Sequence, residues 1–324
     1  MRKSACLLGF LFALALVLLS GGSIAQDFPT KPIKFVVGYP PGGANDTLAR
    51  FVAQKLAENV GQPVIVENRP GADGIIGSEY VAKAAPDGYT LLTGASGQMV
   101  FNTLLRAKLP YDPVKDFVPV TMLYSDPLVF AVHPSVPAST ISDLIALAKA
   151  KPGELFYGSA APPFLVAIEN FKQLASVDIV AVPYKGTGQA VLATVTGEVS
   201  MVMMTAGSLG PQIRAGKLRP LAVTGDKRDH TLPDVPAMSE SGLGMRALSW
   251  SGLFAPAATP QAILDKLYAL LAIVLKSEEM KERFAKRGYG TAVMGMPPAE
   301  FAAFYKSELA YWTKAVMGMK LGVK

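Results

Sequence analysis

The sequence predicts an α/β protein built as two lobes, and three observations indicate this. Short apolar runs typical of β-strands alternate along the chain with helical patterns, as in parallel βαβ units. The alternation occurs as two successive series, and 324 residues are enough for two domains. Further β-rich stretches lie near 125–132 and 249–255, on either side of the second series. We expect the chain to begin one lobe, cross to build the other, and cross back at these stretches.

The first 25 residues have the organisation of a secretory signal peptide. Arg2 and Lys3 precede an apolar run, 5–19, of about 15 residues, which is short of the roughly 20 needed to span a bilayer. Ser23 and Ala25 are the small residues of a cleavage site, with the cut after Ala25. We therefore expect an exported protein; an uncleaved N-terminal anchor is the alternative.

The first series of elements should build most of one lobe. It opens with a strand, a glycine-rich loop and a helix. The helix has Leu48, Val52 and Leu56 on one face, and Asn45 or Asp46 is a suitable N-cap. The expected strands are 33–37, 64–66, 90–93 and two β-rich parts of 118–132, which Ser125-Asp126-Pro127 separates. The expected helices are 46–58 and, near the end of the chain, 263–275 and 299–316.

The second series should build the other lobe. Its first helix aligns Phe164, Ile168, Phe171 and Ala175 on one face. The expected strands are 155–157, 179–182, 201–204 and 218–223, and the expected helices are 164–175, 189–196 and 209–215. With the two crossings, lobe 1 comprises residues 26–127 and 249–324, and lobe 2 comprises residues 128–248.

Charge and composition exclude several classes of function. The formal net charge is +6, from 31 Lys and Arg against 25 Asp and Glu, and the basic residues are not gathered in one patch, so we expect no nucleic-acid partner. The single cysteine, Cys6, excludes a disulfide framework and a thiolate metal cluster. The two histidines, His133 and His230, are too few for a His-rich metal site. We expect no metal and no cofactor.

Three segments rich in small residues follow predicted strands and are candidates for anion binding. The most specific is Gly38-Tyr39-Pro40-Pro41-Gly42-Gly43-Ala44-Asn45-Asp46, and the others are 94–98 and 158–161. Free N–H groups at a helix start attract anions, and the carboxyl ends of parallel strands meet at one edge of a sheet. We expect one crevice lined by main-chain donors and hydroxyls; the alternative is that the glycines and prolines only make turns. Lys185, in a fourth loop, either pairs with the anion or is solvated.

A different class of function, an exported α/β hydrolase, has Ser96 as its candidate nucleophile. Gly94 and Ser96 match the start of a nucleophile elbow, but Gln98 stands where that motif has a glycine. A hydrolase also needs a base, and His133 and His230 lie in a predicted crossing segment and a charged loop. These departures favour binding over catalysis.

Segments along the whole chain resemble the Bug (TctC-like) extracytoplasmic solute receptors. The matching segments are 28–33 (FPTKPI), 39–43 (YPPGG) followed by Asp46, 67–71 (ENRPG) with Gly74 and Gly77, 85–90 (APDGYT), 109–113 (LPYDP), 182–186 (VPYKG), 215–218 (AGKL) and 252–256 (GLFAP). The resemblance implies a type II periplasmic-binding-protein fold, with two α/β lobes joined by two crossing strands. It also implies a periplasmic, non-catalytic receptor that captures a small organic carboxylate and delivers it to the permease subunits of a tripartite tricarboxylate-type transporter. We expect a monomer; a sensor that presents its ligand to a membrane signalling protein is an alternative.

Position by position, the resemblance implies that loop amides, hydroxyls and bridging waters hold the carboxylate. In lobe 1 the implied ligand-binding residues are Pro41, Gly42, Gly43, Ala44, Asn45, Asp46, Ser96, Gly97 and Gln98. In lobe 2 they are Ser159, Ala160, Ala161, Lys185, Gly186, Thr187 and Thr205.

Two segments differ from the family pattern. Ala161-Pro162-Pro163-Phe164 stands where relatives commonly have glycine and small polar residues, and Met204-Thr205 stands where they commonly have Asp-Asn. Both changes make the wall of lobe 2 more apolar, and the second removes an acid that the ammonium of an amino acid would need. We therefore expect a monocarboxylate or an aromatic carboxylate rather than a tricarboxylate or an amino acid.

Overall fold

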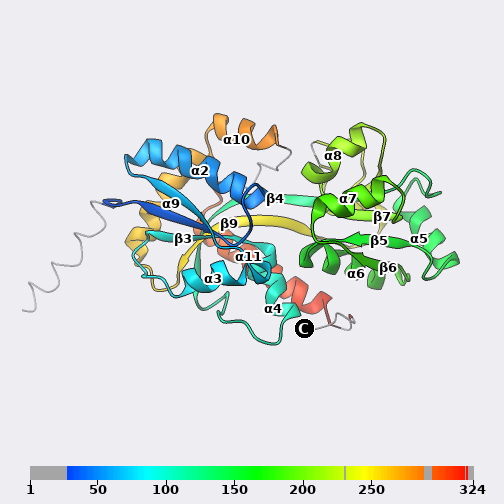
Figure 1. Ribbon diagram of the computed structural model, residues 1–324, viewed down its shortest axis with the longest axis horizontal. Coiled ribbons are helices and arrows are strands. Elements are labelled where there is room, and N and C mark those ends of the chain that lie inside the picture. Colours follow the sequence, from blue (N-terminus) through cyan, green and yellow to red (C-terminus); the bar gives the residue numbers. More distant parts are fainter. Residues whose placement is uncertain (1–27, 230, 288–293, 318, 320–324) are drawn as a thin grey trace, which may run out of the picture.

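The computed structural model has the expected two α/β lobes joined by two crossing strands (Figure 1). It describes residues 28–229, 231–287, 294–317 and 319, so the predicted signal peptide and His230 lie outside the described residues. The strands are β1 (Ile33–Val37), β2 (Val64–Asn68), β3 (Thr90–Ala95), β4 (Phe117–Val132), β5 (Phe156–Ser159), β6 (Val180–Pro183), β7 (Met201–Thr205), β8 (Arg219–Val223) and β9 (Leu248–Pro256). Their order is β2-β1-β3-β9-β4-β7-β5-β6, and β8 also pairs with β4.

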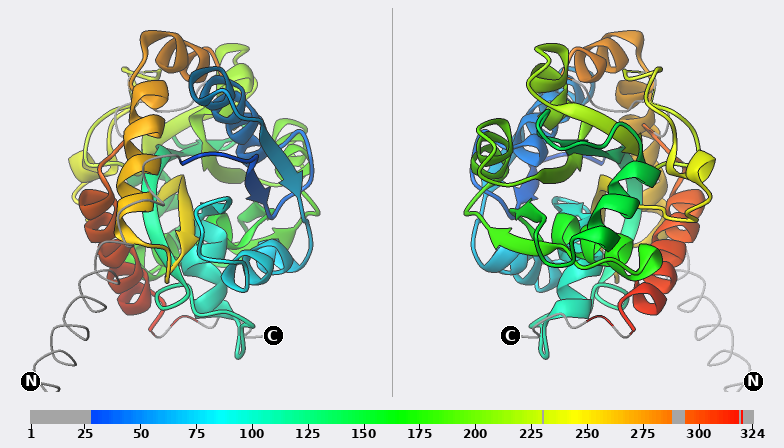
Figure 2. Two further views of the ribbon diagram at one scale, coloured as in Figure 1. Left: turned by 90° about the vertical axis from the view of Figure 1, so that its left-hand side faces the viewer. Right: turned by 90° about the vertical axis from the view of Figure 1, so that its right-hand side faces the viewer.

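In lobe 1, helices cover both faces of the parallel strands β2-β1-β3. The helical elements are α2 (Ala44–Val60), η2 (Ala72–Gly74), α3 (Ile75–Ala82), η3 (Gly97–Phe101), α4 (Asn102–Leu105), α9 (Gln261–Leu275), α10 (Glu278–Ala285) and α11 (Pro298–Ala315). Helices α2, α9 and α10 share one apolar core, while α3 and α11 pack on the opposite face. Figure 2 shows α9, α10 and α11, in orange and red, in the same lobe as the blue α2 and cyan α3, so this lobe is assembled from both ends of the chain.

In lobe 2, helices likewise pack on both faces of the strands. The helical elements are α5 (Ile141–Ala150), α6 (Pro162–Ala175), α7 (Thr187–Val195), α8 (Ala206–Arg214) and η4 (Met238–Ser241). Helices α5 and α6 contribute to one core, and α7 and α8 to the other. None of the helices in the described part of the chain is both long and apolar enough to cross a membrane.

The strands β4 and β9 connect the lobes. Strand β4 pairs antiparallel with β9 as far as Pro127, and from Leu128 onward it pairs with β7 of lobe 2. The predicted break at Ser125-Asp126-Pro127 is wrong, because β9 continues as the partner strand through this point, with Pro127 opposite Leu248. The Leu128 amide then donates to Thr224 Oγ1 (2.9 Å), which fixes the strand where it enters lobe 2. The crossing is therefore a continuous, hydrogen-bonded strand.

The predicted apolar faces are confirmed in the helix interiors. Leu48, Val52 and Leu56 of α2 are fully buried, as are Ile168 and Phe171 of α6. Burial of each such side chain contributes about 1.5–3 kcal/mol. Phe164, in the first turn of α6, is half-buried: it packs against the core and also lines the space between the lobes.

The helices around this space begin earlier than the sequence pattern predicts. Helix α2 begins at Ala44 with Gly43 as its N-cap, so the predicted capping role of Asn45 or Asp46 is wrong. Helices α6, α7 and α8 also begin two to three residues early, at Pro162, Thr187 and Ala206. These helices begin with small residues or prolines, such as Pro162-Pro163, Thr187-Gly188 and Ala206-Gly207, so their starts lack the hydrophobic periodicity that marks a helix. Segment 94–98 is not a loop, because β3 leads through Ser96 directly into η3.

Candidate functional site

A cavity of about 490 Å³ lies between the lobes. Lobe 1 contributes the segment after β1, one residue of η2, the end of β3 with the two residues that follow, and one residue after α10. Lobe 2 contributes the first turns of α6, α7 and α8, and each crossing strand contributes one residue. The lining residues are Tyr39, Gly42, Gly43, Ala44, Asn45, Asp73, Ala95, Ser96, Gly97, Tyr124, Ala161, Pro162, Pro163, Phe164, Thr187, Thr205, Gly207, Ser208, Ser249 and Arg287. We call this cavity the cleft.

Five helical segments begin at the cleft, and none of them is capped by a side chain. Their N-cap residues are Gly43 (α2), Ser96 (η3), Ala161 (α6), Gly186 (α7) and Thr205 (α8). Elsewhere the side chains of Thr140 and Ser277 cap α5 and α10, whereas α3, α9 and α11 also lack a side-chain cap, so what distinguishes the five helix starts is that they meet at one cavity. First-turn N–H groups have no partner within their helix, and the dipole makes each N-terminus positive. Together the uncapped helix starts favour an anionic ligand.

Helix α6 differs from the other four in its ability to donate. Pro162 and Pro163 occupy its first positions and have no N–H group. The amides of Phe164 and Leu165 both donate to the Ala161 carbonyl (3.1 Å each). The start of α6 therefore contributes ring and side-chain carbon, while hydrogen bonds to an anion must come from the other segments.

Hydroxyl groups supplement the amides. Ser96 is only 3% exposed, and within the described residues its hydroxyl has no hydrogen-bond partner, although it lines the cleft. On the opposite wall the Thr205 and Ser208 hydroxyls lie 3.0 Å apart. Burial holds the pKa of the Tyr39 hydroxyl above its ordinary value, so Tyr39 remains a neutral donor. A Cβ on Gly97 would come within 2.9 Å of this hydroxyl, which explains the glycine at that position.

Asp46 supports the cleft from behind and does not line it. Its carboxylate accepts hydrogen bonds from the Gly42 amide (2.9 Å), Asn68 Nδ2 (2.8 Å) and Arg50 Nε (3.1 Å). Burial opposes its charge, but these donors outweigh burial and hold the pKa of Asp46 below its ordinary value. The carboxylate therefore fixes the loop that carries the start of α2.

Gln98 is also turned away from the cleft. It is fully buried, accepts a hydrogen bond from the Ala95 amide (3.1 Å), and donates to Ser78 Oγ (3.0 Å) and the Gly74 carbonyl (3.2 Å). These contacts join η3 to the start of α3. Gln98 thus positions Ser96 and Gly97 from below.

The structure brings together nine of the residues expected to bind ligand. These are Gly42, Gly43, Ala44, Asn45, Ser96, Gly97, Ala161, Thr187 and Thr205. The expected residues that do not line the cleft are Pro41, Asp46, Gln98, Ser159, Ala160, Lys185 and Gly186. Lining residues outside the expected set and the predicted apolar wall are Tyr39, Asp73, Ala95, Tyr124, Gly207, Ser208, Ser249 and Arg287. Tyr39 and Ala95 belong to the predicted anion-binding segments 38–46 and 94–98, whereas no local pattern indicates Arg287.

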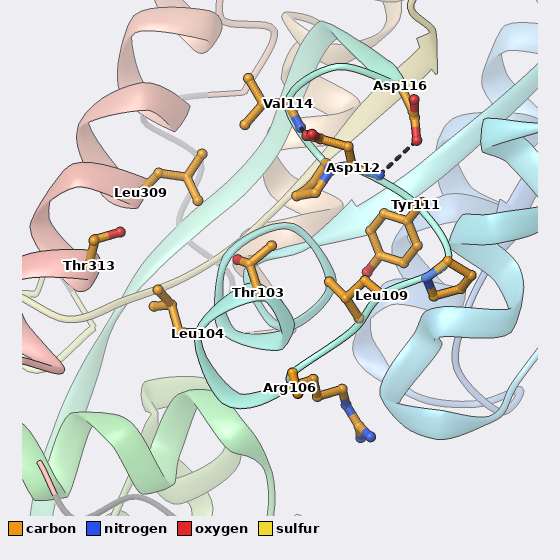
Figure 3. A pocket seen from close by; sticks show the side chains of 13 residues that line it. Thr103, Leu104, Arg106, Leu109, Tyr111, Asp112, Val114, Asp116, Leu309 and Thr313 are labelled. Atoms are coloured by element: carbon orange, nitrogen blue, oxygen red, sulfur yellow. Dashed lines mark hydrogen bonds between the residues drawn. The ribbon is translucent and has the colours of Figure 1, made fainter. Parts of the chain in front are cut away.

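A second, larger hollow of about 730 Å³ lies wholly on lobe 1 (Figure 3). It is bordered by residues between Thr103 and Asp116 and by Leu309 and Thr313 of α11. The carboxylates of Asp112 and Asp116 already accept hydrogen bonds from neighbouring main-chain amides: Asp116 from the Asp112 amide (2.7 Å) and Asp112 from the Val114 amide (2.9 Å). It receives no residue from lobe 2, so the cleft is the better candidate for ligand binding. Nowhere in the described ranges do three His, Cys, Asp or Glu side chains form a group that could hold a metal ion.

The two-lobed fold and the cleft between its lobes define a solute-binding protein. The chain belongs to the tripartite tricarboxylate transporter receptor family, whose model, described as "Tripartite tricarboxylate transporter family receptor", matches residues 48–320. The resemblance seen in the sequence is thereby confirmed.

Relatives and solved structures agree with this assignment. Protein BugT of Bordetella pertussis is 35% identical over 299 residues, which cover 90% of each chain. The structure described as R. palustris Rpa4515 with adipate has a TM-score of 0.80 at 34% identity, covering 90% of this chain and 97% of that one. MatC (Rpa3494) from Rhodopseudomonas palustris with bound malate has a TM-score of 0.77 at 32% identity, covering 89% and 100%.

Proposed function

We propose that this protein is a periplasmic receptor that captures a small organic carboxylate in the cleft and delivers it to the permease of a tripartite tricarboxylate-type transporter. The observation that carries the proposal is the convergence of five uncapped helix starts on one cavity. Four of them retain amide donors at their first positions. A micromolar ligand requires about −8 kcal/mol, and charge-assisted hydrogen bonds contribute roughly 1.5–3 kcal/mol each before ordering costs. Four or five such bonds are sufficient.

The arrangement of the cleft suggests how the ligand lies and how the receptor responds. The carboxylate faces the starts of α2, η3, α7 and α8, and the apolar body of the ligand lies against Pro162, Pro163 and Phe164. A ligand that contacts both lobes binds the closed form better and so shifts the population toward closure. We propose that lobe 1 comprises 26–127 and 249–324, that lobe 2 comprises 128–248, that the protein acts as a monomer, and that the signal peptide is cut after Ala25.

The alternatives rest on weaker support. Ser96 lines the cleft, but none of the described lining residues is a histidine, and the ring of His133 is within 2.7 Å of the Ser135 hydroxyl. A hydrolase would therefore need a base from elsewhere. A sensor would use the same cleft and differ only in its membrane partner.

Calorimetric titration with a panel of mono-, di- and tricarboxylates, and X-ray scattering with and without the bound acid, test the proposal. We expect at least one acid to bind and the radius of gyration to fall on binding. If no carboxylate binds, the proposed function is wrong; if one binds with an unchanged scattering profile, closure is wrong. Uptake of that acid by cells lacking the receptor, with and without complementation, tests delivery.

A further inference from the structure

The described lining of the cleft carries a positive charge that no negative side chain of that lining neutralises. Among the described lining residues, only Asp73 and Arg287 are charged. Asp73 is already neutralised, because its Oδ2 lies 2.5 Å from Nη2 of Arg106. Behind the adjacent loop, Asp46 is likewise paired with Arg50 (2.8 Å). Arg287 is therefore the charge in the described lining that has no ionic partner.

Arg287 is held near the start of α2 by contacts between α10 and α2. It follows the end of α10, which Figure 1 shows beside α2, and Glu279 of α10 forms an ion pair with Lys55 of α2 (2.9 Å). The Arg287 guanidinium lies 5.1 Å from the centre of the Phe51 ring, and that of Arg283 lies 4.6 Å from the same ring. Within the described part of the chain, Arg287 has no carboxylate at ion-pair distance, whereas Lys55 and, to a smaller extent, Arg283 hold the pKa of Glu58 below its ordinary value. Of the two arginines, Arg287 alone is among the described residues that line the cleft, so it places a positive charge at this edge.

We propose that Arg287 determines specificity by binding a second anionic group of the ligand. The inference rests on the proposed function, in which the first carboxylate occupies the uncapped helix starts. A guanidinium presents several N–H groups in a plane and binds a carboxylate in bidentate fashion, and one edge remains free when the face lies over a ring. The preferred ligand then has an anionic group at each end and an apolar body against Pro162 and Phe164. This ligand is a dianion rather than the monocarboxylate that the sequence alone suggests.

Matched pairs of acids that differ by one carboxylate test the inference. The pairs are hexanoate and adipate, butyrate and succinate, and benzoate and terephthalate, each titrated into the wild type, Arg287→Gln, Arg287→Lys and Arg283→Gln. We expect the wild type to prefer the dianion of at least one pair. Arg287→Gln should weaken that dianion by up to about fivefold more than its monoanionic partner, which corresponds to about 1 kcal/mol, the upper end for an exposed ion pair. Arg287→Lys should restore part of the preference.

Arg283→Gln is the matched control, because Arg283 shares the Phe51 ring but does not line the cleft. It should leave the ratio of the two affinities unchanged. Equal binding of both members of every pair by the wild type overturns the inference and leaves the proposed function intact. So does an equal change of the ratio in the Arg283 and Arg287 variants. If none of the six acids binds, the inference is also overturned, and the wider carboxylate panel then decides the proposed function separately.

Discussion

Replacement of Asp46 by alanine should lower both stability and ligand affinity, although Asp46 does not touch the cleft. The carboxylate accepts hydrogen bonds from the Gly42 amide, Asn68 and Arg50, and it is only 3% exposed. Its removal frees the loop that carries the start of α2. The effect on binding should therefore be indirect, through the position of the main-chain donors.

The magnitude follows from the partners that are left behind. The Asn68 amide is half-buried and keeps its hydrogen bond to the Tyr39 carbonyl (3.1 Å), so losing its bond to Asp46 costs about 0.5–1.5 kcal/mol. The side chain of Arg50 is 49% exposed and can be resolvated, so the lost ion pair contributes only about 0.2–1 kcal/mol. We expect a loss of about 1–2 kcal/mol in the free energy of unfolding. Reordering even one loop residue on binding costs about 1–2 kcal/mol, which predicts a roughly tenfold weaker ligand.

Urea unfolding and calorimetric titration measure the two effects, and Asp143→Ala is the control. Asp143 accepts from the amides of Ser139 (3.0 Å) and Thr140 (2.9 Å) at the start of α5, away from the cleft. Its loss should cost about 1 kcal/mol of stability and leave the affinity unchanged. If the Asp46 variant binds ligand as tightly as the Asp143 variant, the supporting role assigned to Asp46 is refuted.

Three further predictions concern the cleft, acid stability and the crossing. Ser96→Ala should weaken binding by about 0.5–1.5 kcal/mol without unfolding the protein, and an unchanged dissociation constant would contradict its role. Because the folded-state pKa of Asp46 is lowered, its stabilisation is complete above the unfolded value of about 3.9 and is lost as pH falls through the folded value. Urea titrations below pH 4 should show a larger loss of stability in the wild type than in Asp46→Asn, because the stabilisation by other carboxyls with lowered pKa values, such as Glu67 and Asp143, is lost in both proteins. Gly252→Ala should cost about 1–3 kcal/mol, since its Cβ would crowd Phe301 and lie 2.9 Å from the Thr121 carbonyl; a wild-type unfolding midpoint would count against this packing.

Local patterns were sufficient for most strands and for the apolar faces of the helices. Leu48, Val52 and Leu56 repeat at the helical period, and all three are buried as predicted. Helix starts at the cleft were predicted too late, because the first residues at Thr187 and Ala206 are small and show no hydrophobic periodicity. The break predicted in β4 was wrong because Pro127 pairs with β9, a segment distant in the sequence, and local patterns do not show such a contact.

For the site, the sequence by itself determined which segments bear small residues after strands, and Gly42, Gly43, Ser96 and Gly97 do line the cleft. Only the tertiary structure decided which side chains within those segments face it. Asp46 and Gln98 turn inward because buried donors and acceptors satisfy them there, and a buried polar group without such partners is costly.

Arg287 illustrates the same limit over a longer distance. In the sequence Arg287 ends the basic stretch 281–287, which has the composition of a solvent-exposed helix face and lies far from the glycine-rich segment. The packing of α10 on α2, through the Lys55–Glu279 ion pair and the contact of Phe284 with Phe51 (6.5 Å between ring centres), places it at the cleft. Periodicity and turn chemistry act over a few residues, so they determine the elements and their loops. The charge balance of a cleft depends on which distant segments pack together, and only the folded chain determines that.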